Sequence, residues 1–172
     1  MKDSVRKEIL DQLVSLDEDI VSKALDKIRK KGDYTFVDPL LNRLTTGENT
    51  LVHAMILQLF QDLKDQPSMD ILIDRLVESQ FDQIRPKLLE CVWQSGIDVC
   101  HKLDEIIDIN LKGDYLVCLE CLTIIENFEP LKDQAKLELN IERMKAEILE
   151  EADTVDDLRM STLEVLENFR SV

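Results

Sequence analysis

Residues 20–28 read Ile-Val-Ser-Lys-Ala-Leu-Asp-Lys-Ile, and positions 20, 24, 25 and 28 are apolar with the spacing i, i+4, i+5, i+8. This spacing places apolar residues on one side of an α-helix. It occurs four times along the chain: Ile20/Ala24/Leu25/Ile28, Leu51/Met55/Ile56/Leu59, Ile84/Leu88/Leu89/Val92 and Val117/Cys121/Leu122/Ile125. The first members of these quartets are 31, 33 and 33 residues apart. A period of this length accommodates two short helices and their turns, so the sequence predicts a tandem helical repeat.

Turn residues and apolar periodicity together predict ten helices, paired into five helical hairpins. The expected helices cover residues 4–15, 18–32, 35–46, 50–64, 67–79, 82–95, 99–112, 115–128, 131–152 and 155–170. Four glycines close periodic segments: Gly32, Gly47, Gly96 and Gly113. We expect these glycines to adopt the left-handed conformation that ends many helices.

The sequence also predicts where helices begin. Three predicted N-caps follow one another at steps of 32 and 33 residues: Asp33, Asp65 and Asp98. Pro86 lies near a helix start, where we expect a small kink or a later beginning.

The first helix of each hairpin has apolar columns of its own. They lie one turn apart on the same face and are Leu41/Ile73/Ile106 and Leu44/Leu76/Ile109. A single amphipathic hairpin leaves one apolar side in water, so stacking of neighbouring hairpins is expected to supply most of the stability. The patterns predict an all-α fold.

The last forty or so residues depart from the period, because the clear repeats cover about residues 16–129. The expected helix over 131–152 is long and strongly charged, and its apolar stripe consists of Leu137, Ile141, Met144 and Ile148. Thr154 with Asp157 resembles a capping box. A terminal repeat needs a polar outer face, and candidates for it are Glu142, Glu150, Glu151, Asp156, Glu164 and Glu167. We predict one domain over residues 1–172, with residues 130–172 as a divergent C-terminal cap.

Composition and charge restrict the possible partners. The chain has 172 residues, 44% of them hydrophobic, and a net charge of −15. Residues 1–33 contain eight basic and eight acidic residues, which leaves 13 basic against 28 acidic residues over 34–172. This acidic excess would repel duplex DNA and anionic membranes, so neither is an expected partner.

The expected location is the cytoplasm. No apolar run of 18 residues occurs, and Met1-Lys2-Asp3-Ser4 leads into an amphipathic segment, unlike the apolar core of a signal peptide. Four cysteines confined to the middle of a chain of this length are typical of reduced core residues, not of a disulfide framework.

The repeat columns resemble those of HEAT repeats, in particular the short bacterial form named for its similarity to phycobilisome lyases. Residues 24–33 (Ala-Leu-Asp-Lys-Ile-Arg-Lys-Lys-Gly-Asp), followed by Val37-Asp38-Pro39-Leu40-Leu41, are similar to the join between repeats in that family. The likeness extends with decreasing clarity to about Glu129. Tetratricopeptide and ankyrin patterns fit worse, because their characteristic columns do not occur. The resemblance implies a right-handed α–α superhelix, a HEAT/armadillo-like solenoid of about five hairpins, with a curved surface for macromolecules and no catalytic residues.

The cysteines invite a second interpretation. Residues 118–121 read Cys-Leu-Glu-Cys, the spacing of a redox or zinc pair, and Cys91, Cys100 and His101 are near in sequence. The pair lies within an apolar helix, however, whereas a reactive pair needs a helix N-terminus to stabilise its thiolate. We therefore interpret the cysteines as small buried hydrophobic residues and expect no metal and no cofactor.

Active-site chemistry has few candidate residues. His53 and His101 are the only histidines, and neither belongs to a recognisable triad or metal motif. Glycine-rich phosphate loops are absent from the sequence. We predict no catalytic residue.

A partner-binding surface is predicted on the second helix of each hairpin, because that helix lines the concave side in HEAT arrays. The positions between its apolar columns change from basic to neutral along the chain. The candidate residues are Lys23, Lys27, Lys30, Gln58, Gln61, Lys87, Cys91, Trp93, Gln94, Glu120 and Asn127. Trp93 is either a partly buried boundary residue or an exposed aromatic anchor. Cys91 should face solvent if its column lines a groove.

The first functional hypothesis is a non-enzymatic scaffold or adaptor that presents a concave helical surface to a protein or peptide. One alternative is an enzyme or enzyme subunit of HEAT-like type, either phycobilisome-lyase-like or DNA-glycosylase-like, against which the charge balance argues. Another is a purely structural element of a larger assembly. The sequence leaves self-association open.

Overall fold

The computed structural model describes residues 2–46, 49–148 and 154–171. Over these residues the chain forms α-helices and short 3₁₀ helices and contains no strand. The α-helices are α1 (Asp3–Leu13), α2 (Glu18–Lys31), α3 (Val37–Thr46), α4 (Thr50–Gln61), α5 (Gln66–Leu76), α6 (Arg85–Ser95), α7 (Leu103–Lys112), α8 (Tyr115–Glu126), α9 (Gln134–Glu147) and α10 (Thr154–Asn168). The 3₁₀ helices are η1 (Tyr34–Phe36), η2 (Ser79–Phe81), η3 (Cys100–Lys102) and η4 (Phe169–Ser171). The predictions of an all-α fold and of ten helices over the described residues are confirmed. Some predicted bounds are wrong: α6 and α7 begin three and four residues later than predicted, and the long helix predicted over 131–152 is α9, which has 14 residues and ends at Glu147.

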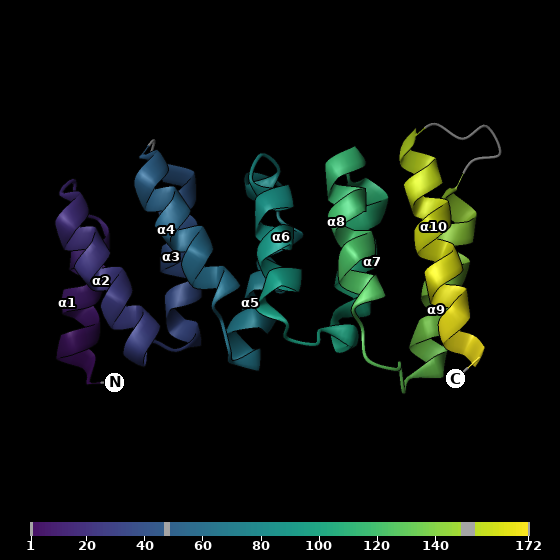
Figure 1. Ribbon diagram of the computed structural model, residues 1–172, viewed down its shortest axis with the longest axis horizontal. Helices are drawn as coiled ribbons and strands as arrows, with labels where there is room; N and C mark the ends of the chain where they lie inside the picture. The colour runs from purple at the N-terminus through teal and green to yellow at the C-terminus, as the bar shows by residue number, and fades with distance from the viewer. Residues whose placement is uncertain (1, 47–48, 149–153, 172) are drawn as a thin grey trace.

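The helices form hairpins that stand side by side in one row (Figure 1). Each odd-numbered helix packs against the even-numbered helix that follows it. The second helices, α2, α4, α6, α8 and α10, contact one another in this order and form one layer, and the first helices, α1, α3, α5, α7 and α9, form the other. The two chain ends lie at opposite ends of the row (Figure 1). The buried apolar residues between the layers form one cluster along the whole row.

Most of the predicted apolar positions lie in this cluster. All members of the two first-helix columns are buried: Leu41, Leu44, Ile73, Leu76, Ile106 and Ile109. In the C-terminal hairpin, Leu137, Ile141 and Met144 are buried, and Ile148 packs against the core. The core therefore continues into the divergent last hairpin.

In two of the second helices, the first residue of the quartet was predicted to be buried but is exposed. Ile20 and Leu51 are 37% and 53% exposed, whereas Val21 and Val52 are buried. Successive helical residues are separated by about 100°, so a quartet with this spacing extends over about 140° and its first member lies at the margin. Val21 and Val52 project closer to the middle of that arc.

Two of the three aspartates predicted as N-caps, Asp33 and Asp65, are confirmed, whereas the prediction for Asp98 is wrong because the N-cap of η3 is Val99. Asp33, Asp65 and Asp98 each accept a hydrogen bond from a backbone N–H two or three residues later, over 3.1–3.2 Å. Other helices have side-chain caps that the sequence analysis did not single out: Asp17, Asn49, Asp114 and Asp133. The late start at Pro86 is also confirmed, because α6 begins at Arg85 and Pro86 is its second residue.

The predicted left-handed conformation is confirmed at Gly96, which has a φ of 70°. It is wrong at Gly32 and Gly113, which have φ of −68° and −81°. These two positions require glycine for space. A Cβ on Gly113 would lie 2.3 Å from Cγ1 of Val117, and one on Gly32 would lie 2.5 Å from the carbonyl oxygen of Ile28. Gly47 lies outside the described residues.

Asp156 does not belong to the polar outer face of the last hairpin. It is buried and lies 3.1 Å from Arg159, which also donates to carbonyl oxygens of Leu111 and Gly113. Packing of α10 against the α7–α8 hairpin encloses this pair. Glu142 and Glu164 are exposed as expected. Glu150, Glu151 and the Thr154 side chain, with its predicted capping box, lie outside the described residues.

Candidate functional site

Ten of the eleven predicted partner-binding residues, all on second helices or their C-caps, are exposed or partly buried, and one of them, Lys27, donates hydrogen bonds to Glu8 and Gln12 of α1. Seven are exposed: Lys23, Lys27, Lys30, Gln58, Lys87, Gln94 and Asn127. Three are partly buried: Gln61, Trp93 and Glu120. Cys91 is buried.

Charge is unevenly distributed over this layer. The last turn of α2 contains three consecutive basic residues, Arg29, Lys30 and Lys31. The next helix of the layer, α4, contains no lysine, arginine, aspartate or glutamate, and α8 contains only Glu120 and Glu126 as charged residues. The layer thus offers charged contacts at its N-terminal end and mainly uncharged contacts at α4.

Trp93 joins two helices of the layer. Its Nε1 donates a hydrogen bond of 2.7 Å to Oε2 of Glu120 on α8, and its ring packs against the core. The interpretation of Trp93 as a partly buried boundary residue is therefore confirmed. The hydrogen bond to Glu120 fixes the orientation of the indole between α6 and α8.

Two pockets lie at the C-terminal ends of adjacent second helices. One, of about 250 Å³, lies between the ends of α2 and α4, with Ile28, Leu59 and Phe60 among its apolar residues. The other, of about 180 Å³, lies between the ends of α6 and α8 and is lined by Trp93 and Asn127. Both are smaller than the pockets of roughly 300–1,000 Å³ that hold small-molecule ligands. Their size fits single side chains of a partner.

The prediction that Cys91 faces solvent is wrong, and so is the assignment of its column, Lys27/Gln58/Cys91/Ile124, to a groove. Cys91 is 1% exposed, and its Sγ lies 3.1 Å from the carbonyl oxygen of Lys87 and 3.5 Å from that of Leu57 on α4. The reason is that α4 and α8 flank α6 on both sides, so positions beside the buried stripe are enclosed as well. Ile124, at the corresponding position of α8, is also buried. Burial, followed by the nearby Glu90, raises the pKa of the Cys91 thiol to about 12.

Cys118 and Cys121 are fully buried, as predicted. Cys118 Sγ donates to the carbonyl oxygen of Asn110 over 3.2 Å, and burial is the main cause that raises the pKa of both thiols. All four cysteines are free. Within the described residues, no group of three or more histidine, cysteine, aspartate and glutamate side chains is placed to hold a metal ion.

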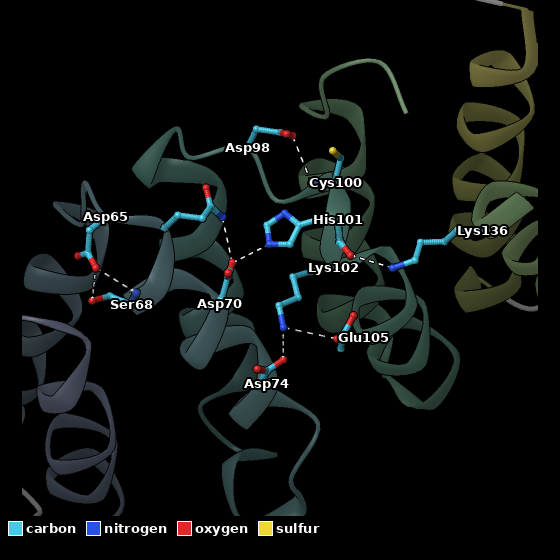
Figure 2. Close-up of polar contacts among 11 residues, drawn as sticks. Asp65, Ser68, Asp70, Asp74, Asp98, Cys100, His101, Lys102, Glu105 and Lys136 are labelled. Atoms are coloured by element: carbon cyan, nitrogen blue, oxygen red, sulfur yellow. Dashed lines mark hydrogen bonds and ion pairs between the residues drawn. The ribbon is translucent and has the colours of Figure 1, made fainter. Parts of the chain in front are cut away.

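His101 belongs to a set of polar contacts that the sequence analysis missed (Figure 2). Its Nε2 lies 2.8 Å from Oδ1 of Asp70 on α5, and the Nζ of Lys102 lies 2.5 Å from Oδ1 of Asp74 on the same helix. Lys136 of α9 donates to the carbonyl oxygen of His101 over 2.9 Å. His101 therefore connects three successive hairpins.

Similar acid–base pairs join other first helices. They are Asp38–Arg75, Asp104–Lys136 and Asp108–Arg143. In each pair, an acidic residue on one first helix contacts a basic residue about one repeat later. Tracking charged residues at the repeat period, as was done for the apolar ones, would have indicated these contacts.

No protein-family model, curated protein or solved structure matches this chain. Among the described residues, no helix is both long enough and apolar enough to cross a membrane.

Proposed function

We propose that this protein is a non-enzymatic binding scaffold that presents its second-helix layer to a protein or peptide. The main support is the continuity of that layer, in which five helices lie side by side, with seven of the predicted residues exposed and three partly buried. A repeated helical surface of this kind offers an extended contact area, within which a few anchors provide most of the affinity.

We further propose that the hairpins form a right-handed superhelix of the HEAT type, with the second helices on its concave side. The second helices contact one another more extensively than the first helices do. A double layer curves toward the side on which its helices approach more closely, which supports placing the second helices inside. The handedness is inferred from the resemblance of the repeat columns to HEAT repeats.

The chemistry of the layer favours an acidic or neutral segment as its ligand. Lys23 and Lys30 are exposed and make no ion pair with any described residue, so they are available to carboxylates of a ligand. The uncharged surface of α4 suits an apolar or neutral continuation of the same segment. Four free thiols support the cytoplasm as the place where binding occurs.

The proposal is tested by affinity capture from native lysate with three baits. The wild type should retain one stoichiometric protein partner. The triple variant Lys23→Ala, Gln58→Ala, Gln94→Ala should lose most of it, because all three side chains are exposed on the second-helix layer. The control variant Asp11→Ala, Asn42→Ala, Glu142→Ala changes three exposed residues of first helices and should retain the partner.

Equal capture by all three baits would contradict the assignment of the binding surface. A bound chromophore or nucleic acid in place of a protein would instead support the enzyme alternative. Circular dichroism of each bait confirms that the substitutions leave the helical fold intact.

A further inference from the structure

The described residues of the turns within the first four hairpins lie along one long edge of the molecule, the upper edge in Figure 1. We define the turn edge as described residues 14–20, 49–51, 77–84 and 112–117. Most of the large hydrophobic residues that the described chain exposes belong to it: Val14, Leu16, Ile20, Leu51, Val77, Tyr115 and Leu116. The opposite edge, where successive hairpins are linked, contributes Tyr34.

The exposed apolar residues recur at each of these four turns. Leu16 is 95% exposed, and Leu51 and Leu116, each the second residue of its helix, are both 53% exposed. Val77 occupies the turn between α5 and α6. Scattered exposed apolar residues are ordinary on a protein surface, whereas repetition along one edge is typical of an interaction site.

Acidic residues surround these apolar positions. The turn edge contains Asp17, Glu18, Asp19, Glu78, Asp82 and Asp114, and its one basic residue among those described is Lys112. Arg75 and Arg85 of the neighbouring helices pair with Glu78 and Asp82, and Arg43 donates to the carbonyl oxygen of Ser15, so these three cations reduce the negative charge of the edge without reversing it. The linking edge contains more lysines, Lys30, Lys31, Lys64 and Lys132, which lie beside carboxylates such as Asp33, Asp62 and Asp65.

This combination favours a cationic amphipathic partner. A second copy of the chain would bring the same acidic edge and another charge of −15 to the contact, and an anionic membrane would be repelled in the same way. Positive side chains around an apolar stripe would complement both the carboxylates and the leucines of the edge.

The spacing of the turns suits a helix. Neighbouring packed helices lie about 8–10 Å apart, and an α-helix rises about 1.5 Å per residue. Apolar residues spaced about seven positions apart on a partner helix would therefore meet successive turns. We propose that the turn edge is a second docking surface, which binds a basic amphipathic helix of a partner protein with apolar residues at about heptad spacing. This surface is separate from the second-helix layer of the proposed function.

The probe is a labelled synthetic peptide of about three heptads, with leucine at the heptad apolar positions and lysine elsewhere. Fluorescence anisotropy should detect its binding to the wild type. The variant Leu16→Ser, Leu51→Ser, Leu116→Ser should weaken binding about tenfold or more, because it removes the apolar contacts and leaves every charge in place. The matched variant Val5→Ser, Tyr34→Ser, Leu139→Ser also replaces three exposed apolar residues, away from the turn edge, and should change the affinity by less than about twofold.

Several outcomes would overturn the inference: no binding to the wild type, equal weakening by both variants, or equal binding of a peptide with glutamate in place of lysine. A wild-type dimer in light scattering that the turn-edge variant dissociates would show that a second copy covers the edge. The Lys23, Gln58 and Gln94 variant separates this inference from the proposed function. If that variant alone weakens peptide binding, the peptide occupies the second-helix layer, and the turn-edge inference fails while the proposed function stands.

Discussion

Cys100 differs from the other three cysteines because it is only partly buried. Burial is nonetheless the main cause that raises the pKa of its thiol, to about 11, and it raises the pKa of the Cys91 thiol to about 12. The thiolate is the reactive form, so a raised pKa slows reaction at neutral pH. Accessibility therefore favours Cys100 among the four cysteines, and its raised pKa makes the reaction slow.

We predict that Cys100 reacts first, and slowly, when the folded protein is treated with Ellman's reagent at neutral pH. The other three thiols should react only after unfolding in guanidinium. Absorbance of the released thionitrobenzoate measures both phases. Cys100→Ser should remove the first phase, and the control Cys91→Ser should leave it unchanged. Labelling of Cys91 in step with Cys100 would contradict its enclosure between α4 and α6.

At the scale of the helix, position relative to the neighbouring hairpins decides how much an apolar side chain contributes to stability. Leu88 on α6 is fully buried, whereas Leu51 on α4 is 53% exposed. We predict that Leu88→Ala lowers the free energy of unfolding by about 2–5 kcal/mol, through lost burial and the cavity it leaves. Leu51→Ala should lower it by less than about 1 kcal/mol, because its side chain gives up little buried surface. Urea unfolding of both variants measures the difference, and equal losses would contradict the observed burial.

Apolar periodicity predicted the helices and their first-helix columns well, because the 3.6-residue period and the capping residues are local properties. The margins of the buried stripe were harder to predict. The exposure of Ile20 and the burial of Cys91 depend on which hairpins pack on either side of their helices. The apolar pattern of a single helix does not contain that information. The candidate residues are accordingly exposed at seven positions, partly buried at three and buried at Cys91. Their role in binding stays a prediction.

Contacts between first helices also depend on ionised carboxylates. Arg75 on α5 donates to both carboxylate oxygens of Asp38 on α3, over 2.7 and 3.1 Å, and these hydrogen bonds lower the pKa of Asp38. A carboxylate with a lowered pKa in the folded state contributes stability above its unfolded pKa of about 3.9. That contribution is lost as the pH falls through the folded pKa.

We predict that the free energy of unfolding of the wild type decreases below about pH 4, and that Asp38→Asn shows a smaller decrease. Urea unfolding at a series of pH values measures both. Asp11→Asn is the control, because Asp11 is exposed and makes no hydrogen bond or ion pair with a described residue, so this variant should keep the wild-type dependence. If Asp38→Asn and the wild type lose the same free energy in acid, the Asp38–Arg75 pair does not couple these helices in solution.

Over the whole molecule, stability is expected to be uneven, because hairpins in a row are stabilised mainly by their neighbours. The two ends of this row differ. At the N-terminal end, α1 packs mainly against α2 and α3, whereas at the C-terminal end α10 packs extensively against α8 and also against α9. The divergent last hairpin thus closes the row with a larger contact than the first hairpin does.

Amide hydrogen exchange should report this asymmetry, because an amide exchanges when its helix opens locally and the free energy of opening reflects the contacts that are lost. We predict that α1 exchanges fastest of the described helices, that α6 and α8 in the middle of the row exchange slowest, and that α10 is protected nearly as well as α8. Mass spectrometry of peptic fragments after timed exchange measures all four helices in one experiment. The variant Val21→Ala tests whether contacts between neighbouring helices set these exchange rates. Because Val21 is fully buried in α2, its truncation should speed exchange in α1 and α2 and leave exchange in α8 and α10 unchanged. Fast exchange of α10 in the wild type, or an equal effect of Val21→Ala on all helices, would contradict a row of hairpins held together by nearest neighbours.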